Sequence, residues 1–284
     1  MKRLKMVIPK GRLYAEVVRL LNDAGFAVEE DAEAYRPGIG LPGFEAKVLK
    51  PQNIPRLIEL GAHDLGFTGH DWVVESGANL TEVMDLDFNP VRIAAAVPDG
   101  FSETEARRRR IIVASEYESI TRRFLDERGF TAVLLRTFGA TEVFPPDDAD
   151  MIVDNVSTGR TLRAHGLRIY ANLLDSTTRL VADPAALNDP WKRERIGEVK
   201  LLLRSVLDAR SRVMLEMNVP AGGLDGIVAL LPCMRSPTVS PLFAGHGYAV
   251  KAAVLRGDAA RLIPRLKKAG ASDILEYEFS KVVL

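Results

Sequence analysis

The stretch that decides the fold is Asp150-Met151-Ile152-Val153-Asp154-Asn155-Val156-Ser157-Thr158-Gly159-Arg160-Thr161-Leu162-Arg163-Ala164-His165-Gly166-Leu167. Its apolar start, Met151 to Val153, predicts a short buried strand. From Leu162 onward it predicts a helix that stops near Gly166. A strand, a Ser/Thr/Gly turn and a helix in this order are typical of a phosphate cradle, because backbone N–H groups at a helix start attract anions. A βα turn with an ordinary N-cap and no ligand has the same pattern.

The side chains in and around this turn favour a phosphorylated sugar as its ligand. Asp154, at the strand end, can accept hydrogen bonds from sugar hydroxyls, and Arg160 and Arg163 add positive charge. Glycine in the turn lets the backbone approach a ligand closely, and the hydroxyls supply further hydrogen bonds. These turn positions are Ser157, Thr158, Gly159 and Thr161.

The composition narrows the class of protein. With 284 residues we expect two or three domains and a sizeable core. The 38 basic and 38 acidic residues cancel, so no general attraction to nucleic acid or to a membrane surface is expected. Cys233 is the single cysteine, which excludes an internal disulfide and a cysteine-caged metal. We find no signal peptide and no membrane-spanning run, and expect a cytoplasmic protein.

Three further turns have the same strand–turn–helix setting. They are Lys10-Gly11-Arg12, Thr68-Gly69-His70 and Gly139-Ala140-Thr141. Strands and helices alternate over residues 4–180, which predicts largely parallel sheets whose carboxyl ends bind ligands. Two alternatives remain at this point: Lys10 and Arg12 as solvated surface bases, and His70 as an ordinary turn histidine. The absence of a neighbouring cysteine or second histidine argues against metal at His70.

One helix in this body has clear signals at both ends. Ser115 and Glu118 form a capping-box pattern at the start of one helix, and Gly129 is expected to end it. Arg107 to Arg110 form a basic run that we interpret as solvated.

After a hinge at residues 210–212, the order of the predicted strands and helices changes. Strands at 213–219, 238–243, 248–255 and 274–283 and helices at 224–231 and 258–269 give the order βαββαβ. This order predicts a ferredoxin-like, ACT-like domain, which suits a small-ligand regulatory module or an assembly surface.

Together these motifs resemble the long form of the ATP phosphoribosyltransferase family, over essentially the whole chain. The most specific stretch is Val153 to Leu167, which resembles the family signature containing its phosphoribosyl-pyrophosphate loop. The supporting matches lie at residues 9–13, 64–69, 86–88 and 139–143, and in the last domain at residues 236–242 and 268–272.

The resemblance implies an architecture. Two catalytic α/β lobes would form a bilobal pair like periplasmic solute-binding proteins, followed by the ferredoxin-like regulatory domain. The first lobe is expected to be discontinuous, at residues 1–90 plus 181–210, the second at 91–180 and the regulatory domain at 211–284. A homo-oligomer, from dimer to hexamer, is expected.

The resemblance also implies an activity. ATP would condense with 5-phosphoribosyl 1-pyrophosphate to give N1-(5-phospho-β-D-ribosyl)-ATP and pyrophosphate, the first step of histidine biosynthesis. Mg²⁺ would bind mainly through substrate oxygens and not in a protein metal site, and L-histidine would inhibit through the last domain. The catalytic residues would be Glu142, Asp154 and Arg12.

The binding residues follow from the same resemblance. Phosphoribosyl pyrophosphate would be held by Asp154, Ser157, Thr158, Gly159, Arg160 and Thr161. ATP and its phosphates would be held by Lys10, Gly11, Arg12, Gly69, His70, Gly139 and Thr141. Regulatory histidine would be held by Ser236, Thr238 and Ser240.

Three departures and two alternatives accompany this hypothesis. The segment after Glu142 is compressed at residues 144–148, and His165 stands where asparagine is common in the family. Asn155 stands where many other phosphoribosyltransferases have a second acid. A non-catalytic bilobal ligand-binding sensor would show similar anion-friendly turns. A catalytically impaired paralogue acting as a regulatory subunit is the other alternative, and the retained Lys10, Arg12 and Asp154 argue against it.

Overall fold

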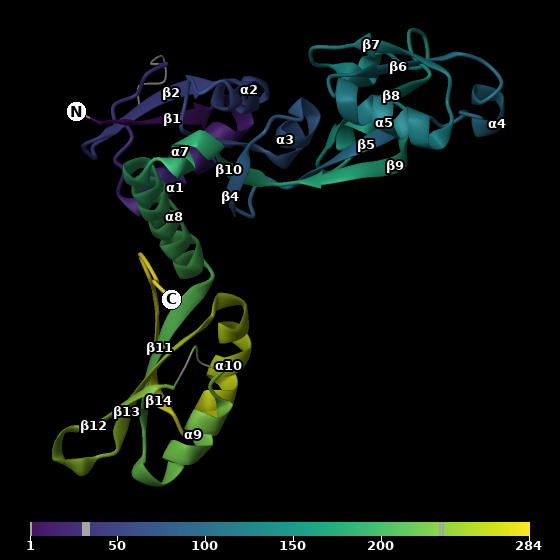
Figure 1. Cartoon of the computed structure of the whole chain (residues 1–284). Coiled ribbons are helices and arrows are strands. Elements are labelled where there is room, and N and C mark those ends of the chain that lie inside the picture. Colours follow the sequence, from purple (N-terminus) through teal and green to yellow (C-terminus); the bar gives the residue numbers. More distant parts are fainter. Residues whose placement is uncertain (1, 30–34, 233, 235) are drawn as a thin grey trace. The chain divides into compact units, whose positions relative to one another are not determined.

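The computed structural model describes residues 2–29, 35–232, 234 and 236–284, so Cys233 lies outside the described residues. The chain forms two compact units (Figure 1). The larger comprises Met1–Val18 and Ala27–Ile196, and the smaller comprises Arg19–Phe26 and Gly197–Leu284. The long helix α8, Pro190–Arg210, begins in the larger unit and ends in the smaller. The finer domain limits inferred from the sequence stay predictions.

The larger unit contains two five-stranded sheets. We call the parts built on them the first and second lobes. The first sheet has the order β2-β1-β3-β10-β4. Its strands are β1 Leu4–Pro9, β2 Phe44–Leu49, β3 Leu65–Gly69, β4 Thr81–Asp85 and β10 Thr178–Ala182. The helical segments between and after these strands are η1 Gly11–Leu13, α1 Tyr14–Ala24, η2 Pro51–Asn53, α2 Ile54–Glu59, α3 His70–Ser76 and α7 Pro184–Asn188.

The sheet of the second lobe has the order β7-β6-β8-β5-β9. Its strands are β5 Val91–Pro98, β6 Ile111–Ser115, β7 Ala132–Arg136, β8 Met151–Val156 and β9 Leu167–Ser176. The helical segments are α4 Glu103–Ala106, α5 Glu118–Arg128, η3 Thr141–Val143 and α6 Arg160–Ala164. Two α/β sheets joined by two passages of the chain confirm the predicted bilobal, periplasmic-binding-protein-like architecture.

The prediction of largely parallel sheets is wrong for half of each sheet. β1 pairs in parallel with β2 and β3, and β6 with β7 and β8, as expected. The pairings of β10 with β3 and β4, and of β5 with β8 and β9, are antiparallel. The cause is the two-way crossing between the lobes: the chain leaves through β4 and β5 and returns through β9 and β10. An outgoing and a returning strand that pair must run in opposite directions, which accounts for the pairings of β4 with β10 and of β5 with β9.

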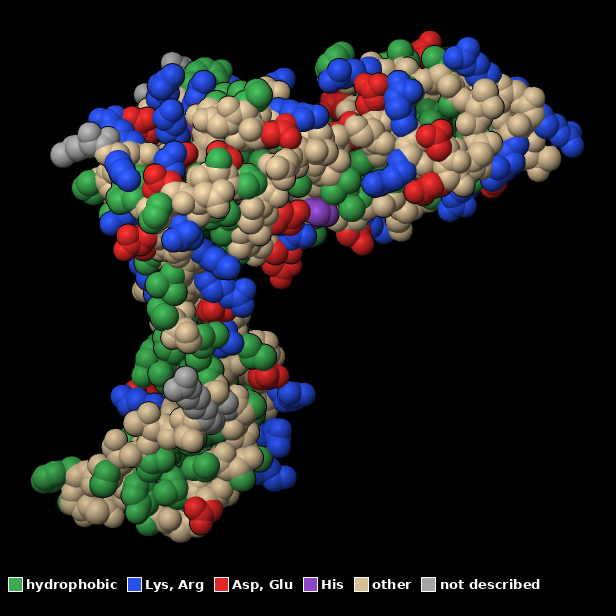
Figure 2. All heavy atoms as spheres, in the orientation of Figure 1, with side chains coloured by type: hydrophobic (Ala, Val, Ile, Leu, Met, Phe, Trp, Pro, Cys, Tyr) green, Lys and Arg blue, Asp and Glu red, His purple; other side chains and the backbone are tan. Residues whose placement is uncertain are grey.

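The basic run Arg107 to Arg110 is exposed, as predicted, and two of its arginines form ion pairs. Arg109 forms an ion pair with Asp150, whose carboxylate also accepts the backbone N–H of Ile112 at 2.8 Å. Arg107 pairs with Glu103 at 2.7 Å. The Asp150 contacts fasten the start of β6 and the segment before it to the start of β8. Over the face shown in Figure 2, basic and acidic side chains are interspersed, in line with the zero net charge.

The smaller unit confirms the predicted ferredoxin-like domain. Its sheet has the order β12-β13-β11-β14 and every pairing is antiparallel. Val213, Leu215, Met217 and Val219 alternate along β11 and are buried against the helices. The last strand ends at Glu278, five residues earlier than the predicted 283. The elements are β11 Arg212–Val219, η4 Ala221–Gly223, α9 Leu224–Leu230, β12 Thr238–Pro241, η5 Phe243–Gly245, β13 Tyr248–Leu255, α10 Arg256–Lys268 and β14 Ser272–Glu278.

A buried carboxylate ties the first lobe together. Asp64, only 4% exposed, accepts the backbone N–H of Lys5 at 2.8 Å and the Nζ of Lys192 at 2.6 Å. It thereby joins β1, the start of β3 and α8.

Among the described residues, no helix is both long and apolar enough to cross a membrane.

We predict that Asp64→Ala lowers the free energy of unfolding by about 2 kcal/mol, because a buried N–H and an ammonium lose their acceptor. Urea denaturation followed by circular dichroism measures this change. The control is Glu45→Ala, which removes only the exposed ion pair with Arg3 and should leave the midpoint nearly unchanged. Equal midpoints for both variants would contradict the anchoring role of Asp64.

Candidate active site

The turn after β8 forms one wall of a pocket of about 290 Å³. Gly159 has a left-handed backbone (φ +68°), and α6 starts at Arg160, two residues before the predicted Leu162. The structure brings the predicted sugar-phosphate residues and Glu142 together around this pocket. Their lining positions are Glu142, Asp154, Asn155, Ser157, Thr158, Gly159, Arg160 and Thr161. The first N–H groups of a helix lack partners within the helix, so this wall suits an anion.

The surroundings of Asp154 disfavour the ionised form of its carboxyl group. Burial raises its pKa to about 6, and the negative charges of Glu116 and Glu142 act in the same direction. Hydrogen bonds from Asn155, through its backbone N–H at 2.6 Å, and from the Thr141 hydroxyl favour the ionised form and oppose this rise. The Asn155 side-chain amide also donates to Asp154 at 3.1 Å. The departure at position 155 therefore replaces a repelling acid with a hydrogen-bond donor.

A smaller pocket of about 140 Å³ lies between the lobes. Arg12 and Gly69 line it from the first lobe, and Asn155 from the second. Gly69 is required here by space, since a Cβ at this position would lie 2.0 Å from the Asp71 carboxylate. Asn155 lines both this pocket and the 290 Å³ pocket, so the two share a wall.

The joint beside this pocket was not predicted from the sequence. The Asp71 carboxylate accepts the Tyr117 hydroxyl at 2.8 Å and the Ser176 hydroxyl at 2.6 Å. Trp72 stacks on Tyr117 with ring centroids 4.5 Å apart. Burial and the Asp71 charge raise the pKa of Tyr117, so its hydroxyl stays protonated and donates. This joint connects α3 of the first lobe to the start of α5 in the second.

The same joint corrects the predicted capping box. The helix α5 begins at Glu118, and its early N–H groups are capped from the first lobe by Glu75, which accepts from Ser119 at 2.9 Å and Ile120 at 3.0 Å. The Ser115 hydroxyl instead donates to the carbonyl of Val153. The helix ends before Gly129, as predicted.

The largest of these pockets, about 660 Å³, was also missed. Its lining includes three cations, two carboxylates and two aromatic rings: Lys50, Arg56, Arg136, Glu75, Glu116, Trp72 and Phe138. Trp72 and Glu116 line both this pocket and the 140 Å³ one. The three pockets therefore follow one another along the lobes. Lys50 follows β2 directly and Arg136 ends β7, and these strand-end positions were the sequence signal that could have found them.

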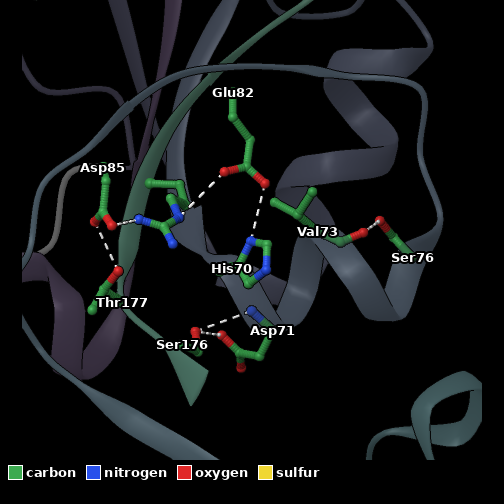
Figure 3. Close-up of polar contacts among 9 residues, drawn as sticks. His70, Asp71, Val73, Ser76, Glu82, Asp85, Ser176 and Thr177 are labelled. Atoms are coloured by element: carbon green, nitrogen blue, oxygen red, sulfur yellow. Dashed lines mark hydrogen bonds and ion pairs between the residues drawn. The ribbon is translucent and has the colours of Figure 1, made fainter. Parts of the chain in front are cut away.

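Several predicted nucleotide residues lie outside these pockets. His70 bonds through Nδ1 to Glu82 at 3.0 Å, and Glu82 also pairs with Arg179 (Figure 3). Lys10 donates to the Tyr35 hydroxyl at 3.0 Å. Gly11 and Gly139 have left-handed turns and line none of the three pockets. Thr141 is buried, 3.0 Å from the Thr137 hydroxyl, and acts on Asp154 from behind.

The residues predicted to bind regulatory L-histidine lie along one exposed segment of the smaller unit. Ser236 precedes β12, and Thr238 and Ser240 belong to it. Thr238 is opposite Lys251 of β13, which pairs with Glu216 at 3.0 Å. Alternation along the strands therefore places Thr238 and Ser240 on the sheet face that carries this ion pair.

The fold and the pockets define a class before any relative is considered. Two α/β lobes, a helix-opening phosphate turn beside an ionisable carboxylate and an appended ferredoxin-like domain describe a phosphosugar-handling enzyme with a candidate regulatory module. Known proteins identify the family within this class.

The model of the family described as "HisG: ATP phosphoribosyltransferase" matches residues 50–205, and that described as "HisG, C-terminal domain" matches residues 209–281. Full-length relatives named ATP phosphoribosyltransferase include one from Chlorobium phaeovibrioides, 40% identical over 99% of this chain and 97% of that protein. Another, from Pelotomaculum thermopropionicum, is 39% identical over 99% of both. A solved ATP phosphoribosyl transferase (HisG:HisZ) complex from Thermotoga maritima matches with a TM-score of 0.65 and 26% identity, over 72% of this chain and 98% of that one. The chain belongs to the ATP phosphoribosyltransferase family, which confirms the family predicted from the sequence.

The raised pKa of Asp154 predicts how stability depends on pH. The folded-state pKa of about 6 exceeds the unfolded value of roughly 3.9, so the fold favours the protonated acid. The cost of the buried charge is absent below about pH 4, grows between about pH 4 and pH 6 and is complete above pH 6. We expect Asp154→Asn to stabilise the protein by about 2 kcal/mol at pH 8 and hardly at all at pH 4. Denaturation at both pH values measures this difference, and a pH-independent effect would contradict the burial of the charge.

Proposed function

We propose that this chain catalyses the condensation of ATP with phosphoribosyl pyrophosphate, releasing pyrophosphate and opening histidine biosynthesis. The observation that carries the proposal is the 290 Å³ pocket, where the Ser157–Thr161 turn, Asp154 and Glu142 meet in a chain related over its whole length to ATP phosphoribosyltransferases. Membership of the family supports a phosphoribosyltransferase that acts on these two substrates.

The sugar phosphate is assigned to the second lobe. The 5-phosphate lies against the backbone N–H groups at the start of α6, with Ser157, Thr158 and Thr161 supplying hydroxyl donors. Asp154 accepts hydrogen bonds from the ribose hydroxyls, which requires the ionised carboxylate and therefore a pH above about 6. Holding both reactants in line supplies much of the catalysis, roughly 7–11 kcal/mol where orientation is good.

The reacting centre is assigned to the shared wall of the pockets. Adenine N1 attacks ribose C1 and pyrophosphate leaves, so positive charge develops on the sugar. Glu142 and Asp154 place negative charge beside it, which stabilises that charge electrostatically. Arg12, in the adjoining 140 Å³ pocket, pairs with substrate phosphate. Adenine N1 is itself nucleophilic, so no strong general base is needed.

The nucleotide is assigned to the 660 Å³ pocket and its border with the 140 Å³ pocket. Lys50, Arg56 and Arg136 offer positive charge to a triphosphate, partly balanced by Glu75 and Glu116 in the same lining. Gly69 and Arg12 line the adjoining 140 Å³ pocket. Direct contacts of ATP with Lys10, Gly11, His70, Gly139 and Thr141 stay predictions, and the contacts of Lys10, His70 and Thr141 with other side chains favour supporting roles for those three.

The proposed metal is Mg²⁺ carried by the substrates. No group of three or more His, Cys, Asp or Glu side chains that could hold a metal lies within the described part of the chain. The donor set nevertheless suits a substrate-borne ion, because Asp154, Glu142 and Glu116 create a negative field around the pocket. Mg²⁺ prefers oxygen ligands, keeps several waters and neutralises phosphate charge. With the ion bound to substrate, these carboxylates would face its water shell.

Regulation, assembly and location complete the proposal. L-Histidine inhibits by binding the ferredoxin-like unit near Ser236, Thr238 and Ser240, where Glu216 offers an anion for its α-amino group. The active form is a homo-oligomer between dimer and hexamer, and the enzyme works in the cytoplasm, where both substrates occur.

The first experiment measures pyrophosphate release from purified protein with ATP, phosphoribosyl pyrophosphate and Mg²⁺, with pyrophosphatase present to draw the reaction forward. We expect release that needs both substrates and falls when L-histidine is added. Release that ignores histidine would remove the regulatory assignment but keep the enzyme. No release from folded protein would favour the ligand-binding sensor or the regulatory paralogue.

We predict that Asp154→Asn lowers kcat/KM for phosphoribosyl pyrophosphate at least about 100-fold, since a transition-state contact to a carboxylate is lost. In the wild type, this kcat/KM should rise through pH 6 and level off above it, following ionisation of Asp154. Near-normal turnover by the folded variant would exclude the assigned role. The matched control is Asp148→Asn, an exposed acid outside the three pockets.

A further inference from the structure

We infer that Phe138 is the platform on which the adenine ring of ATP stacks, and so a residue that determines specificity for the nucleotide. This inference rests on the proposed function and deepens it, because neither the motifs nor the family match points to this side chain. It concerns the base alone and not the phosphates.

Phe138 is exposed in a way that the fold does not explain. Its side chain is 84% exposed although it lies in a lining position of the 660 Å³ pocket. The Arg136 guanidinium lies over its ring, 5.4 Å from the centroid. One ring face is therefore supported by a cation, and an aromatic ring offers its second face to another flat group.

The backbone holds this ring out from the lobe. Gly139 and Ala140 both have left-handed conformations, with φ of +101° and +51°. Directly afterwards, buried Thr141 anchors the loop through Thr137. A left-handed conformation is strained for alanine and persists only where the surrounding structure holds it. The loop is therefore firmly anchored, and Phe138 stays exposed at its start.

The surroundings match a nucleotide better than a purely apolar partner. Lys50 and Arg56 suit phosphates, while the amides of Gln52 and Asn53 suit the polar edge of a purine. Stacking on an aromatic side chain is a common way to hold a base, because every base has a π face. A pocket with these cations and amides beside one exposed ring fits a purine nucleoside triphosphate.

The loop also places the base within reach of the sugar. Phe138 is four residues before Glu142, which lines the 290 Å³ pocket, so the chain between them spans at most about 14 Å. A purine stacked on Phe138 can therefore direct its N1 edge toward the ribose held beside Asp154. The loop from Thr137 to Val143 thus contributes to both substrate sites.

The test separates the Michaelis constants of the two substrates. We expect Phe138→Ala to raise KM for ATP at least about five-fold, the lower end of what a base–aromatic stack contributes. KM for phosphoribosyl pyrophosphate should stay within about two-fold, and Phe138→Trp should restore the wild-type KM for ATP. The matched control is Phe243→Ala, which removes another exposed phenylalanine, 96% exposed and in the smaller unit, and should change neither constant.

Calorimetric titration with ATP and light scattering keep the outcomes distinct. ATP affinity should fall in Phe138→Ala as its KM rises, with the molecular mass unchanged. An unchanged KM for ATP, an equal rise in both constants, or failure of Phe138→Trp to rescue would overturn the inference. A lower mass would assign Phe138 to contact with a second copy of the chain instead. Wild-type protein that binds ATP through Phe138 without releasing pyrophosphate would contradict the proposed function but not the stacking.

Discussion

The buried carboxylate of Asp71 is the interaction on which the arrangement of the site depends. It joins the start of α3 to Tyr117 of the second lobe and to Ser176, where the chain passes back between the lobes. Its neighbour Trp72 stacks on Tyr117, and Glu75 of the same helix caps α5. All three pockets border this joint or share a wall with a pocket that does. Gly69, which the sequence suggests as part of a phosphate-binding turn, also leaves the room that the Asp71 carboxylate needs to form this joint.

Asp154 shows how a binding site opposes stability. Burial, together with the nearby charges of Glu116 and Glu142, raises the pKa of Asp154 to about 6. Thr141 and Asn155 donate hydrogen bonds that keep the ionised form accessible near neutral pH. A carboxylate held in this way gains most from a ligand that supplies hydroxyl donors and a nearby cation, which ribose and substrate-bound Mg²⁺ provide. The free-energy cost of the buried Asp154 charge is relieved when substrate binds, so this relief contributes to the affinity for substrate.

The sequence predicted local features that depend on short-range rules. The Ser157–Thr161 turn, the Gly129 helix end and the βαββαβ order are all encoded by neighbours in the chain. The mixed sheets were not foreseen, because the long strand β9 shows no clean alternation of buried and exposed residues. The Asp71 joint and the ring of Phe138 beside Arg136 could not be derived either, since their partners or surroundings come from distant segments. For His70 the sequence gives no sign of Glu82, which pairs with it from strand β4 (Figure 3).

The central claim is that the two substrates bind in neighbouring pockets and contact different segments of the chain. Hydrogen exchange followed by mass spectrometry tests it directly, with each substrate added alone and then both together with Mg²⁺. The account predicts that phosphoribosyl pyrophosphate protects amides in residues 154–161, whereas ATP protects residues 50–56 and 136–138. Protection of the same segment by both substrates, or protection by ATP confined to residues 154–161, would contradict it.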